Sequence, residues 1–279
     1  MDKHLEAVTT YYNTRESKRG YSLLLHGTKH FGYYKKGDSI WQFSRTMRRM
    51  EQELAEKLNL PTGSKVLDAG CGVGDVASYL ASNCGYQVEG VDILDFNIDE
   101  AKKRIESRGL SDLVNVQLMS YEDLDFPAKS FDAIYTMETF VHSSQPQKVL
   151  RDFYRLLKPG GKIVLFEYAH EDFRQMSERA KKVISFINRY SAMPAFQEFT
   201  YGVQRKMMEE SGFVDIKVTN ISKYIMPMLK AFNILAYVPY AIITILGKRS
   251  QYVNMMSAVE LYRYRNYIRY NIYTAEKPI

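Results

Sequence analysis

A glycine-rich turn constrains the fold of this chain more than any other feature of its sequence. The turn reads Asp68-Ala-Gly-Cys-Gly-Val-Gly74 and directly follows a short apolar run. Glycines at this spacing let the chain leave a strand, turn tightly and open a helix whose N-terminus approaches a ligand closely. The third glycine comes one residue early for a dinucleotide fingerprint, and Asp68 would repel phosphate. The turn therefore predicts a nucleotide-type cofactor that carries a positive charge.

Strand-like and helix-like segments alternate around this turn and predict an α/β fold. Such an alternation forms a Rossmann-like, doubly wound, mostly parallel sheet with helices on its faces. We expect seven strands, with the last one antiparallel, and a cofactor-binding core at residues 61–170. The expected strands are 65–69, 87–92, 114–119, 131–137, 162–168, 214–220 and 267–275, and the expected core helices are 75–83, 99–108 and 146–157.

The segments on either side of the core are expected to cover the ligands. Residues 1–60 have helical character and contain an aromatic loop at 26–34, which predicts a helical lid that becomes ordered when the cofactor binds. Residues 171–279 are expected to supply helical insertions over the substrate, the first at 171–190, and the closing strands of the same sheet.

One segment of this C-terminal region, residues 226–247, is apolar and about as long as a bilayer span. Pro227, Pro239 and Lys230 interrupt it, so we expect a buried or interfacial segment instead of a spanning helix. Peripheral membrane contact stays open on this reading. The apolar run from Tyr240 to Leu246 also favours a homo-oligomer.

Composition excludes several classes of protein. Hydrophobic residues make up 46% and charged residues 25% of the chain, which excludes disorder. Two cysteines, Cys71 and Cys84, are too few for a disulfide framework, and the charged N-terminus lacks the apolar run of a signal peptide, so a cytoplasmic protein is expected. The net charge of +6 is scattered along the chain, and we expect no nucleic-acid partner. Apart from the pair Glu138 and His142, the sequence has no Asp/Glu/His cluster with metal-ligand spacing, so no metal is expected.

A second acidic residue supports the cofactor site. Asp92 closes the second expected strand about 20 residues after the turn, where a carboxylate accepts both hydroxyls of a ribose. Asp68 suits an ammonium group, such as the one on the methionine end of S-adenosylmethionine.

Three motifs, in order and at normal spacing, resemble those of class I S-adenosylmethionine-dependent methyltransferases. They are Val66-Leu-Asp-Ala-Gly-Cys-Gly-Val-Gly74, Ser130-Phe-Asp-Ala-Ile-Tyr135 and Leu157-Lys-Pro-Gly-Gly161. The resemblance implies S-adenosyl-L-methionine as the cofactor and an expected set of contacts. It assigns the methionine moiety to Asp68, Gly70 and Gly72, and the ribose and adenine to Asp92 and Ile93. The edge of the adenine would be bound by Ser120, where many relatives carry aspartate, or by Tyr121. Met137 completes the site.

A second resemblance, to sterol 24-C-methyltransferases and bacterial terpene-methylating enzymes, concerns the acceptor. It rests on Tyr21 with His30-Phe31, on Tyr135-Thr-Met-Glu-Thr-Phe-Val-His142, on Phe166-Glu-Tyr168 and on the hydrophobic C-terminal region. The N-terminal motif lacks most of that family's glycines and its tryptophan. The resemblance implies methyl transfer to carbon of a small apolar or prenylated acceptor, an isoprenoid, terpenoid or sterol-like alkene, through a carbocation.

Glu138 and His142 are the expected catalytic pair, because they lie four residues apart after the fourth strand, at the ligand-binding edge of the sheet. One of them would accept the proton that the carbocation loses, and Tyr21 and His30 are further catalytic candidates. An aromatic wall of Tyr21, Phe31, Tyr33, Tyr34 and Tyr168 would stabilise the cation.

Two other functions stay open. The first is an O- or N-methyltransferase of a small secondary metabolite, in which His142 or His30 is the general base. The second is a non-catalytic binding or scaffold protein that keeps the fold and uses its tyrosine-rich tail as an interaction surface.

Overall fold

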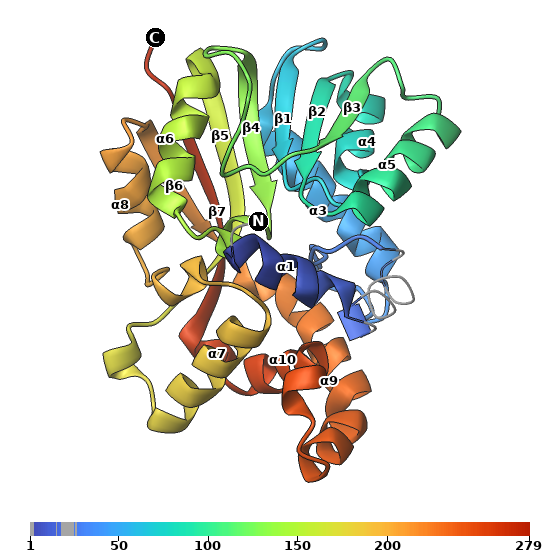
Figure 1. Cartoon of the computed structure of the whole chain (residues 1–279), viewed down its shortest axis with the longest axis vertical. Coiled ribbons are helices and arrows are strands. Elements are labelled where there is room, and N and C mark those ends of the chain that lie inside the picture. The colour runs from blue at the N-terminus through green and yellow to red at the C-terminus, as the bar shows by residue number, and fades with distance from the viewer. Residues whose placement is uncertain (1–2, 15, 18–24, 26) are drawn as a thin grey trace.

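The computed structural model describes residues 3–14, 16–17, 25 and 27–279 (Figure 1). The candidate residue Tyr21 lies outside the described residues.

A seven-stranded sheet in the order β3-β2-β1-β4-β5-β7-β6 forms the centre of the molecule. Strands β1 to β5 pair in parallel, and β7 is antiparallel to both of its neighbours, as the sequence predicted. The bounds are β1 Lys65–Ala69, β2 Gln87–Asp92, β3 Val114–Leu118, β4 Phe131–Met137, β5 Leu157–His170, β6 Val214–Asn220 and β7 Ile268–Glu276.

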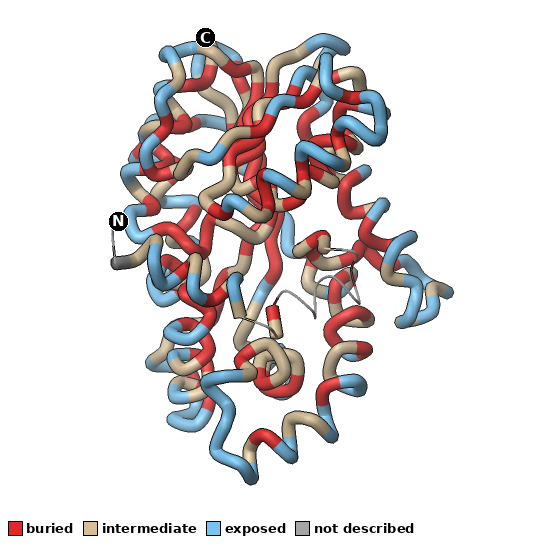
Figure 2. The backbone as a smooth tube through the Cα atoms, turned by 45° about the vertical axis from the view of Figure 1, so that its right-hand side comes forward, coloured by how far each residue is buried: buried red, intermediate tan, exposed pale blue. Residues whose placement is uncertain are grey.

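Helices cover both faces of this sheet because successive strand residues point to opposite sides. Val66 packs into one core with helices α3, α4 and α5, whereas the next residue, Leu67, packs into a second core with α6, α7 and α8. Figure 2 shows the buried residues concentrated in the sheet and beneath these helices. The bounds are α3 Phe43–Leu58, α4 Asp75–Cys84, α5 Asp95–Ser107, α6 Pro146–Leu156, α7 Glu178–Tyr190 and α8 Val203–Glu210.

The remaining helices lie at the carboxyl ends of the parallel strands. Helix α1 (Lys3–Asn13) crosses the ends of the strands, and α9 (Ser222–Ile245) and α10 (Val253–Arg263) pack together beyond it, at the lower end of the molecule in Figure 1. This placement leaves the glycine turn between the sheet and a helical cover.

Several sequence expectations need correction. The insertion predicted to be helical at 171–190 begins its helix only at Glu178, because Ser177 caps α7 by accepting a hydrogen bond from the Ala180 amide. Helix α5 begins at Asp95, four residues before the predicted start. The apolar segment 226–247 belongs mostly to one continuous helix that contains both Pro227 and Pro239. Helix α10 was not predicted at all.

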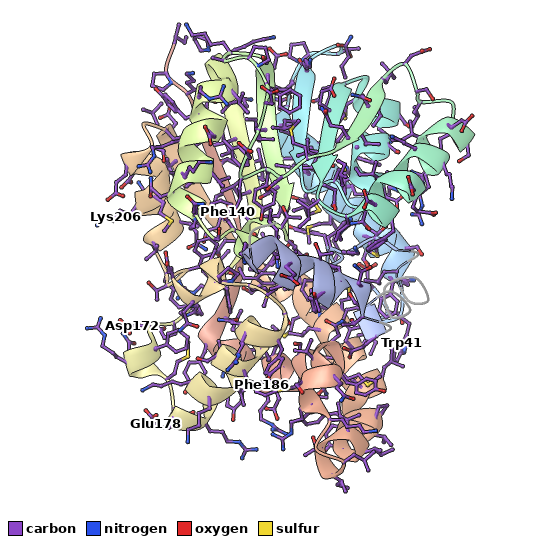
Figure 3. All side chains as sticks on the ribbon, in the orientation of Figure 1. Trp41, Phe140, Asp172, Glu178, Phe186 and Lys206 are labelled. Atoms are coloured by element: carbon purple, nitrogen blue, oxygen red, sulfur yellow. The ribbon has the colours of Figure 1, made fainter. Side chains whose placement is uncertain are left out.

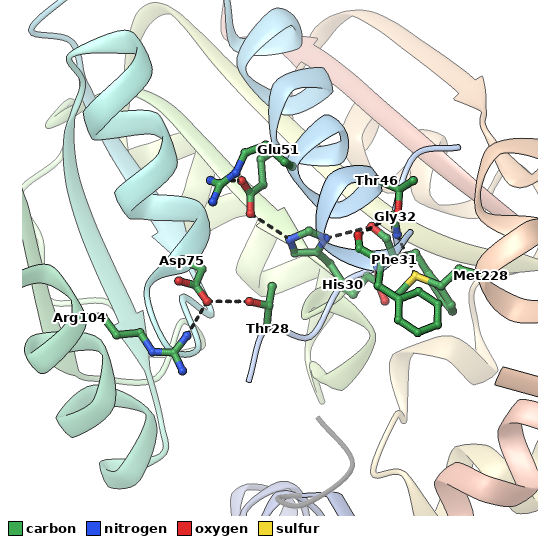
Figure 4. Close-up of polar contacts among 12 residues, drawn as sticks. Thr28, His30, Phe31, Gly32, Thr46, Glu51, Asp75, Arg104 and Met228 are labelled. Carbon is green, nitrogen blue, oxygen red and sulfur yellow. Dashed lines mark hydrogen bonds and ion pairs between the residues drawn. The ribbon is translucent and has the colours of Figure 1, made fainter. Parts of the chain in front are cut away.

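Residues 27–34, which we call the strap, cross the core and are held by backbone hydrogen bonds. The Tyr33 amide donates to the Thr46 carbonyl of α3 (2.8 Å), and the Tyr34 amide donates to the Tyr224 carbonyl of α9 (2.9 Å). The Gly32 amide contacts the Met228 sulfur at 3.1 Å (Figure 4). The strap therefore joins helices that are far apart in the sequence.

Gly32 allows the strap to approach α3 closely. A Cβ atom at this position would lie 2.2 Å from the Thr46 Oγ1 atom and 2.8 Å from its Cβ atom, closer than van der Waals contact allows. We expect Gly32→Ala to lower the free energy of unfolding by about 1–3 kcal/mol, because the strap must move away from α3. Urea unfolding measures this change. The exposed helix residue Ser44 provides a control, since Ser44→Ala is expected to stay within about 0.5 kcal/mol of the parent. Equal stability of the two variants would contradict the close contact.

Candidate active site

A pocket lies at the carboxyl ends of β1, β2 and β4, beneath α1. The glycine turn, the loops after β2, β3 and β4, and the strap supply its walls, and the lid residues His4, Leu5, Val8 and Tyr12 cover it. The cavity that remains has a volume of about 100 Å3. Ligands bind at this edge of open α/β sheets because the strand order reverses there, between β1 and β4.

The glycines of the turn meet two different requirements. Gly70 has a φ of +98°, and a Cβ atom there would lie 2.6 Å from the Thr139 side chain. Gly72 has a φ of +54°, and a Cβ atom there would meet no atom within 4 Å, because Gly72 faces open space. Gly70 is therefore needed for packing, whereas Gly72 leaves room for a ligand next to the backbone.

Asp68 is buried at the base of the pocket, and within the described part of the chain one of its carboxylate oxygens lacks a hydrogen-bond partner. Its Oδ2 atom has no partner within normal hydrogen-bond distance among the described residues. Burial raises the pKa of Asp68 to about 7 and Asp92 adds to this rise, whereas the nearby Tyr135 hydroxyl opposes it. A positively charged group in the pocket would satisfy the orphaned oxygen and stabilise the ionised carboxylate. This orphaned oxygen fits the ammonium group that the sequence motif implied.

Asp92 organises the turn as well as facing the ligand. Its Oδ2 atom accepts a hydrogen bond from the Gly72 amide (2.9 Å), and its Oδ1 atom accepts from the Leu94 amide (2.9 Å) and the Asn97 side chain (3.1 Å). A carboxylate offers about four acceptor sites, so capacity remains for a ribose hydroxyl. The role of Asp92 in holding Gly72 was not foreseen from the sequence.

The predicted adenine contacts line the same pocket. The Ser120 hydroxyl accepts a hydrogen bond from the Glu122 amide (3.1 Å), and the Tyr121 hydroxyl donates to the Thr139 carbonyl (2.8 Å). Ile93 packs against a cluster that includes Val8 and Tyr11 of α1. Met137 also lines the pocket. The structure brings these residues together, and their contacts with the cofactor stay predictions.

Glu138 lines the pocket and is held by three hydrogen bonds. It has a φ of +60°, which is rare for a residue with a side chain. Its Oε1 atom accepts hydrogen bonds from the Phe31 amide (2.7 Å) and the Tyr270 hydroxyl (2.8 Å), and its Oε2 atom accepts one from the Tyr168 hydroxyl. Burial raises the pKa of Glu138, and these donors partly oppose that rise.

Aromatic rings surround this carboxyl group, but not all the rings that were expected. Phe31 lies edge-on to Tyr168 and Tyr270, with ring centroids 6.3 Å and 6.0 Å apart. Tyr33 instead stacks on Tyr224 at 4.2 Å, and the Tyr34 hydroxyl donates to the Ile40 carbonyl. The expected wall therefore includes Phe31 and Tyr168 but not Tyr33 or Tyr34. Tyr270 was missed because it lies in the last strand, more than 100 residues along the chain from Glu138.

Glu167 is a second buried carboxyl group that sequence reasoning did not single out. Its oxygens accept hydrogen bonds from the Val141 amide (3.0 Å) and the Tyr168 amide (3.0 Å). Burial raises the pKa of Glu167 to about 8, and Glu138 adds to this rise. At neutral pH Glu167 is therefore mostly protonated. Its hydrogen bonds hold the loop that follows β4.

His142 lines the pocket on the side of the lid, away from the partners of Glu138. Its Nδ1 atom lies 2.7 Å from the Ala192 carbonyl, and its Nε2 atom lies 2.8 Å from the Tyr12 hydroxyl. Burial lowers the pKa of His142 to about 4. Both ring nitrogens thus have partners, and the ring is a weak base.

His30 belongs to the strap and lines the pocket, with its ring directed at Glu51 (Figure 4). Its Nε2 atom is 3.6 Å from the buried Glu51 carboxylate, and its Nδ1 atom is 2.9 Å from the Phe31 carbonyl. Burial by itself would lower the pKa of His30, but Glu51 outweighs burial and the pKa is raised. The ion pair fixes the strap on α3.

A charge cluster anchors the strap at the start of α4. The Thr28 hydroxyl and the Arg104 guanidinium each approach the Asp75 Oδ2 atom at 2.6 Å (Figure 4), and Arg108 contacts its Oδ1 atom at 2.6 Å. Arginine lowers the pKa of Asp75 despite its burial.

Over the described ranges, no group of three His, Cys, Asp or Glu side chains is placed to hold a metal ion.

Comparisons with known proteins agree with this geometry. A family model described as a methyltransferase domain matches residues 67–165. The S-adenosyl-L-methionine-dependent Diels-Alderase iccD of Talaromyces variabilis is 36% identical over 278 residues, which cover 98% of this chain and 95% of that protein. Sterol 24-C-methyltransferase of Yarrowia lipolytica is 32% identical over 185 residues, 66% of this chain and 47% of that protein. The crystal structure of the (4+2)-cyclase SpnF has a TM-score of 0.77 at 23% identity and covers 98% of this chain and 96% of that one.

Fold and site together define a protein of the class I S-adenosylmethionine-binding type. The chain belongs to the S-adenosylmethionine-dependent methyltransferase family, and both resemblances found in the sequence are confirmed. Its cofactor is S-adenosylmethionine. The orphaned oxygen of Asp68 and the open space at Gly72 fit this cofactor.

The raised pKa of Asp68 predicts a pH-dependent affinity for the cofactor. Only the ionised carboxylate pairs with an ammonium group, so affinity should rise with pH through about 7 and level off above it. In the free protein the same shift acts on stability with the opposite sign. Because the unfolded carboxyl ionises near 3.8 and the folded one near 7, stability is lost as the pH rises across that window.

Calorimetric titration of S-adenosylmethionine at several pH values measures this dependence. We expect Asp68→Asn to weaken binding at about pH 8 by at least about tenfold and to flatten the pH profile, because one charge interaction is lost. The exposed Asp112 provides the control, and Asp112→Asn should bind like the parent at every pH. An unchanged profile in Asp68→Asn would show that another group causes it.

Proposed function

We propose that this chain catalyses an intramolecular Diels-Alder cycloaddition of a linear polyene, with S-adenosylmethionine bound but not consumed. Similarity to the Diels-Alderase iccD over nearly the whole length of both chains supports the proposal. In such a reaction a conjugated diene and an alkene of one molecule convert three π-bonds into two carbon–carbon σ-bonds and one π-bond. No atom leaves and no proton is transferred.

The observation that carries this proposal is the cluster of Glu138, Tyr168 and Tyr270. Burial raises the pKa of both tyrosines well above its ordinary value, so their hydroxyls stay protonated and donate hydrogen bonds. His142, the other expected catalytic residue, is a weak base with both nitrogens bonded. The cluster is therefore suited to hydrogen-bond donation rather than to proton removal.

These residues would accelerate a cycloaddition in two ways. Aromatic rings and the lid exclude water and hold a flexible polyene in a folded conformation, which removes much of the entropic barrier. On substrate binding, a hydroxyl of Tyr168 or Tyr270 would turn its single proton from Glu138 to a carbonyl conjugated with the alkene and withdraw electron density from it. Glu138 holds both hydroxyls in position. When bound, the cofactor supplies a positively charged sulfonium group.

A second candidate is methyl transfer to carbon of a terpenoid or sterol-like alkene. Phe31, Tyr168 and Tyr270 enclose the Glu138 carboxyl group, and aromatic faces next to a carboxylate stabilise a carbocation. The alkene would attack the sulfonium methyl group, and the resulting cation would lose a proton to Glu138. Similarity to a sterol 24-C-methyltransferase supports this candidate.

The mass of the product distinguishes the two reactions. We expect purified protein, incubated with methyl-labelled S-adenosylmethionine and a linear polyene that carries a diene and an alkene conjugated to a carbonyl, to release an isomer of the substrate. The label should stay in the cofactor, since no group is transferred. Protein stripped of the cofactor measures the uncatalysed background. A product heavier by one CH2 group, formed together with the demethylated cofactor, would instead support methyl transfer.

Loss of a hydroxyl donor tests the roles of the tyrosines. We expect Tyr168→Phe and Tyr270→Phe each to lower the rate of cyclisation about ten- to a hundredfold, because one preorganised hydrogen bond to the substrate is lost. Affinity for S-adenosylmethionine, measured by calorimetry, should be unchanged. The exposed Tyr190 of α7 supplies the matched control, as Tyr190→Phe should keep the full rate. Full activity in both Tyr168→Phe and Tyr270→Phe would remove these residues from the proposed mechanism.

Replacement of His142 tests the O- or N-methyltransferase alternative. We expect His142→Ala to change the rate by less than about tenfold, because a histidine with a pKa of about 4 is a poor general base at neutral pH. A loss of more than about a hundredfold, with cofactor affinity intact, would favour the alternative. If the parent protein does not bind S-adenosylmethionine, the result would favour a scaffold protein and would exclude each of the proposed enzymatic functions.

A further inference from the structure

Helix α9 divides into two halves with different surroundings. Ile225, Met228, Leu229 and Ala231 of its first half are buried against the strap and the core. Its second half, residues 234–246, extends to the lower end of the molecule beyond α10 (Figure 1). Among the described residues, α9 is the one helix with the length and composition of a membrane span.

The second half presents a continuous apolar face to solvent. At 100° per residue, the exposed positions fall within about half of the helix circumference, whereas Ala236 and Ile243 face the protein. The exposed fractions reach 66% at Val238 and 85% at Ile245. All exposed residues of this face are apolar or aromatic, and they are Ile234, Leu235, Tyr237, Val238, Ala241, Ile242, Ile245 and Leu246.

Positive charge borders this face. Lys230 is exposed one turn before its start, and Lys248 and Arg249 follow its end. Helix α9 contains no Asp or Glu. The face therefore combines exposed hydrocarbon with cations, which is the pattern of a helix that lies on an anionic lipid surface.

A groove of about 580 Å3 runs between α7 and the α9–α10 pair, next to the apolar face. Arg179, Lys182 and Arg249 line it, and within the described part of the chain none of the three forms an ion pair. The acidic residues of the groove are already paired, since Glu178 contacts Lys181 and Glu260 contacts Arg263, each at 2.6 Å. Figure 3 marks α7 in this region with Glu178 and Phe186.

We propose that residues 234–246 of α9 lie in the surface of an anionic lipid bilayer, with phosphate groups of the lipids bound by the cations of the groove. Hydrocarbon chains would take the exposed apolar face, and the unpaired Arg179, Lys182 and Arg249 would face the negatively charged headgroups.

The geometry favours this placement over a spanning helix. The exposed apolar stretch is about 20 Å long, which is short of the roughly 30 Å of a hydrocarbon core. The first half of α9 is packed inside the protein and is not available to lipid. Pro239 has no amide hydrogen, so the Leu235 carbonyl lacks its helical donor, and water at an interface can supply one.

Charge also favours a bilayer over a second copy of the chain. Two copies joined through this face would bring together the cations at its ends and along its edge. An anionic surface neutralises the same cations. The proposal does not depend on the reaction, because membrane contact would serve either candidate function by delivering an apolar substrate to the helix that carries Phe232, whose ring lies 6.3 Å from that of Phe31.

Sedimentation with lipid vesicles tests the proposal on the full chain. We expect the protein to sediment with vesicles that contain phosphatidylserine, more weakly with vesicles of phosphatidylcholine alone, and less in high salt. The double variant Val238→Glu, Ile245→Glu should reduce binding at least about tenfold, because two apolar side chains no longer enter the bilayer. Val218, which is 41% exposed on β6, provides the control, and Val218→Glu should bind like the parent.

Neutralising the groove separates charge from hydrophobic contact. We expect Lys182→Gln with Arg249→Gln to remove most of the preference for phosphatidylserine, at about fivefold per residue, and to leave binding to phosphatidylcholine unchanged. Circular dichroism and thermal unfolding confirm that each variant is folded. Equal binding of the parent to both vesicles, or no binding to either, would overturn the proposal. An oligomer that dissociates in Val238→Glu, Ile245→Glu, without vesicle binding by the parent, would show that a second copy covers the face.

Discussion

The buried carboxyl group of Glu138 joins the strap to β5 and β7, two strands that the sheet already places side by side. It accepts hydrogen bonds from the strap, from Tyr168 of β5 and from Tyr270 of β7, and it lies at the end of β4 in a strained backbone conformation. A buried carboxyl group with these donors is stable. Removal of one donor would leave a buried oxygen without a hydrogen bond and would lower the free energy of unfolding. The strap therefore meets β5 and β7 at this one side chain.

The two acidic residues of the pocket, Asp92 and Asp68, have different hydrogen-bonding environments. Asp92 accepts three hydrogen bonds from the protein and fixes the glycine turn, so its charge is satisfied before any ligand arrives. Asp68 is buried with an oxygen that has no partner within hydrogen-bond distance among the described residues, and burial raises its pKa to about 7. Asp92 thus fixes the turn, and Asp68 keeps an acceptor that a cation would satisfy.

The sheet could be predicted from sequence because each parallel strand is a short apolar run with a turn at its end. Strands 65–69, 87–92 and 131–137 were predicted to the residue. The partners of Glu138 could not be predicted in the same way. Phe31 and Tyr270 reach it from opposite ends of the chain, and no local pattern distinguishes Tyr270 from the other tyrosines of the sequence. Helix α10 was missed because the polar Glu260 occupies one of its buried positions. His142 was assigned as a base from its spacing, its place after the fourth strand and its motif, and none of these reports burial, which makes it a weak base.

The two ends of the strap make contacts that can form only at different times during synthesis of the chain. Its anchor Asp75 is 47 residues from Thr28, whereas the sulfur atom that Gly32 contacts, in Met228, is 196 residues away. On a ribosome the first contact can form while the parallel strands are still emerging, but the second must wait until α9 has been made. All residues that line the pocket lie before residue 143, so its lining has been synthesised before α9 secures the far end of the strap.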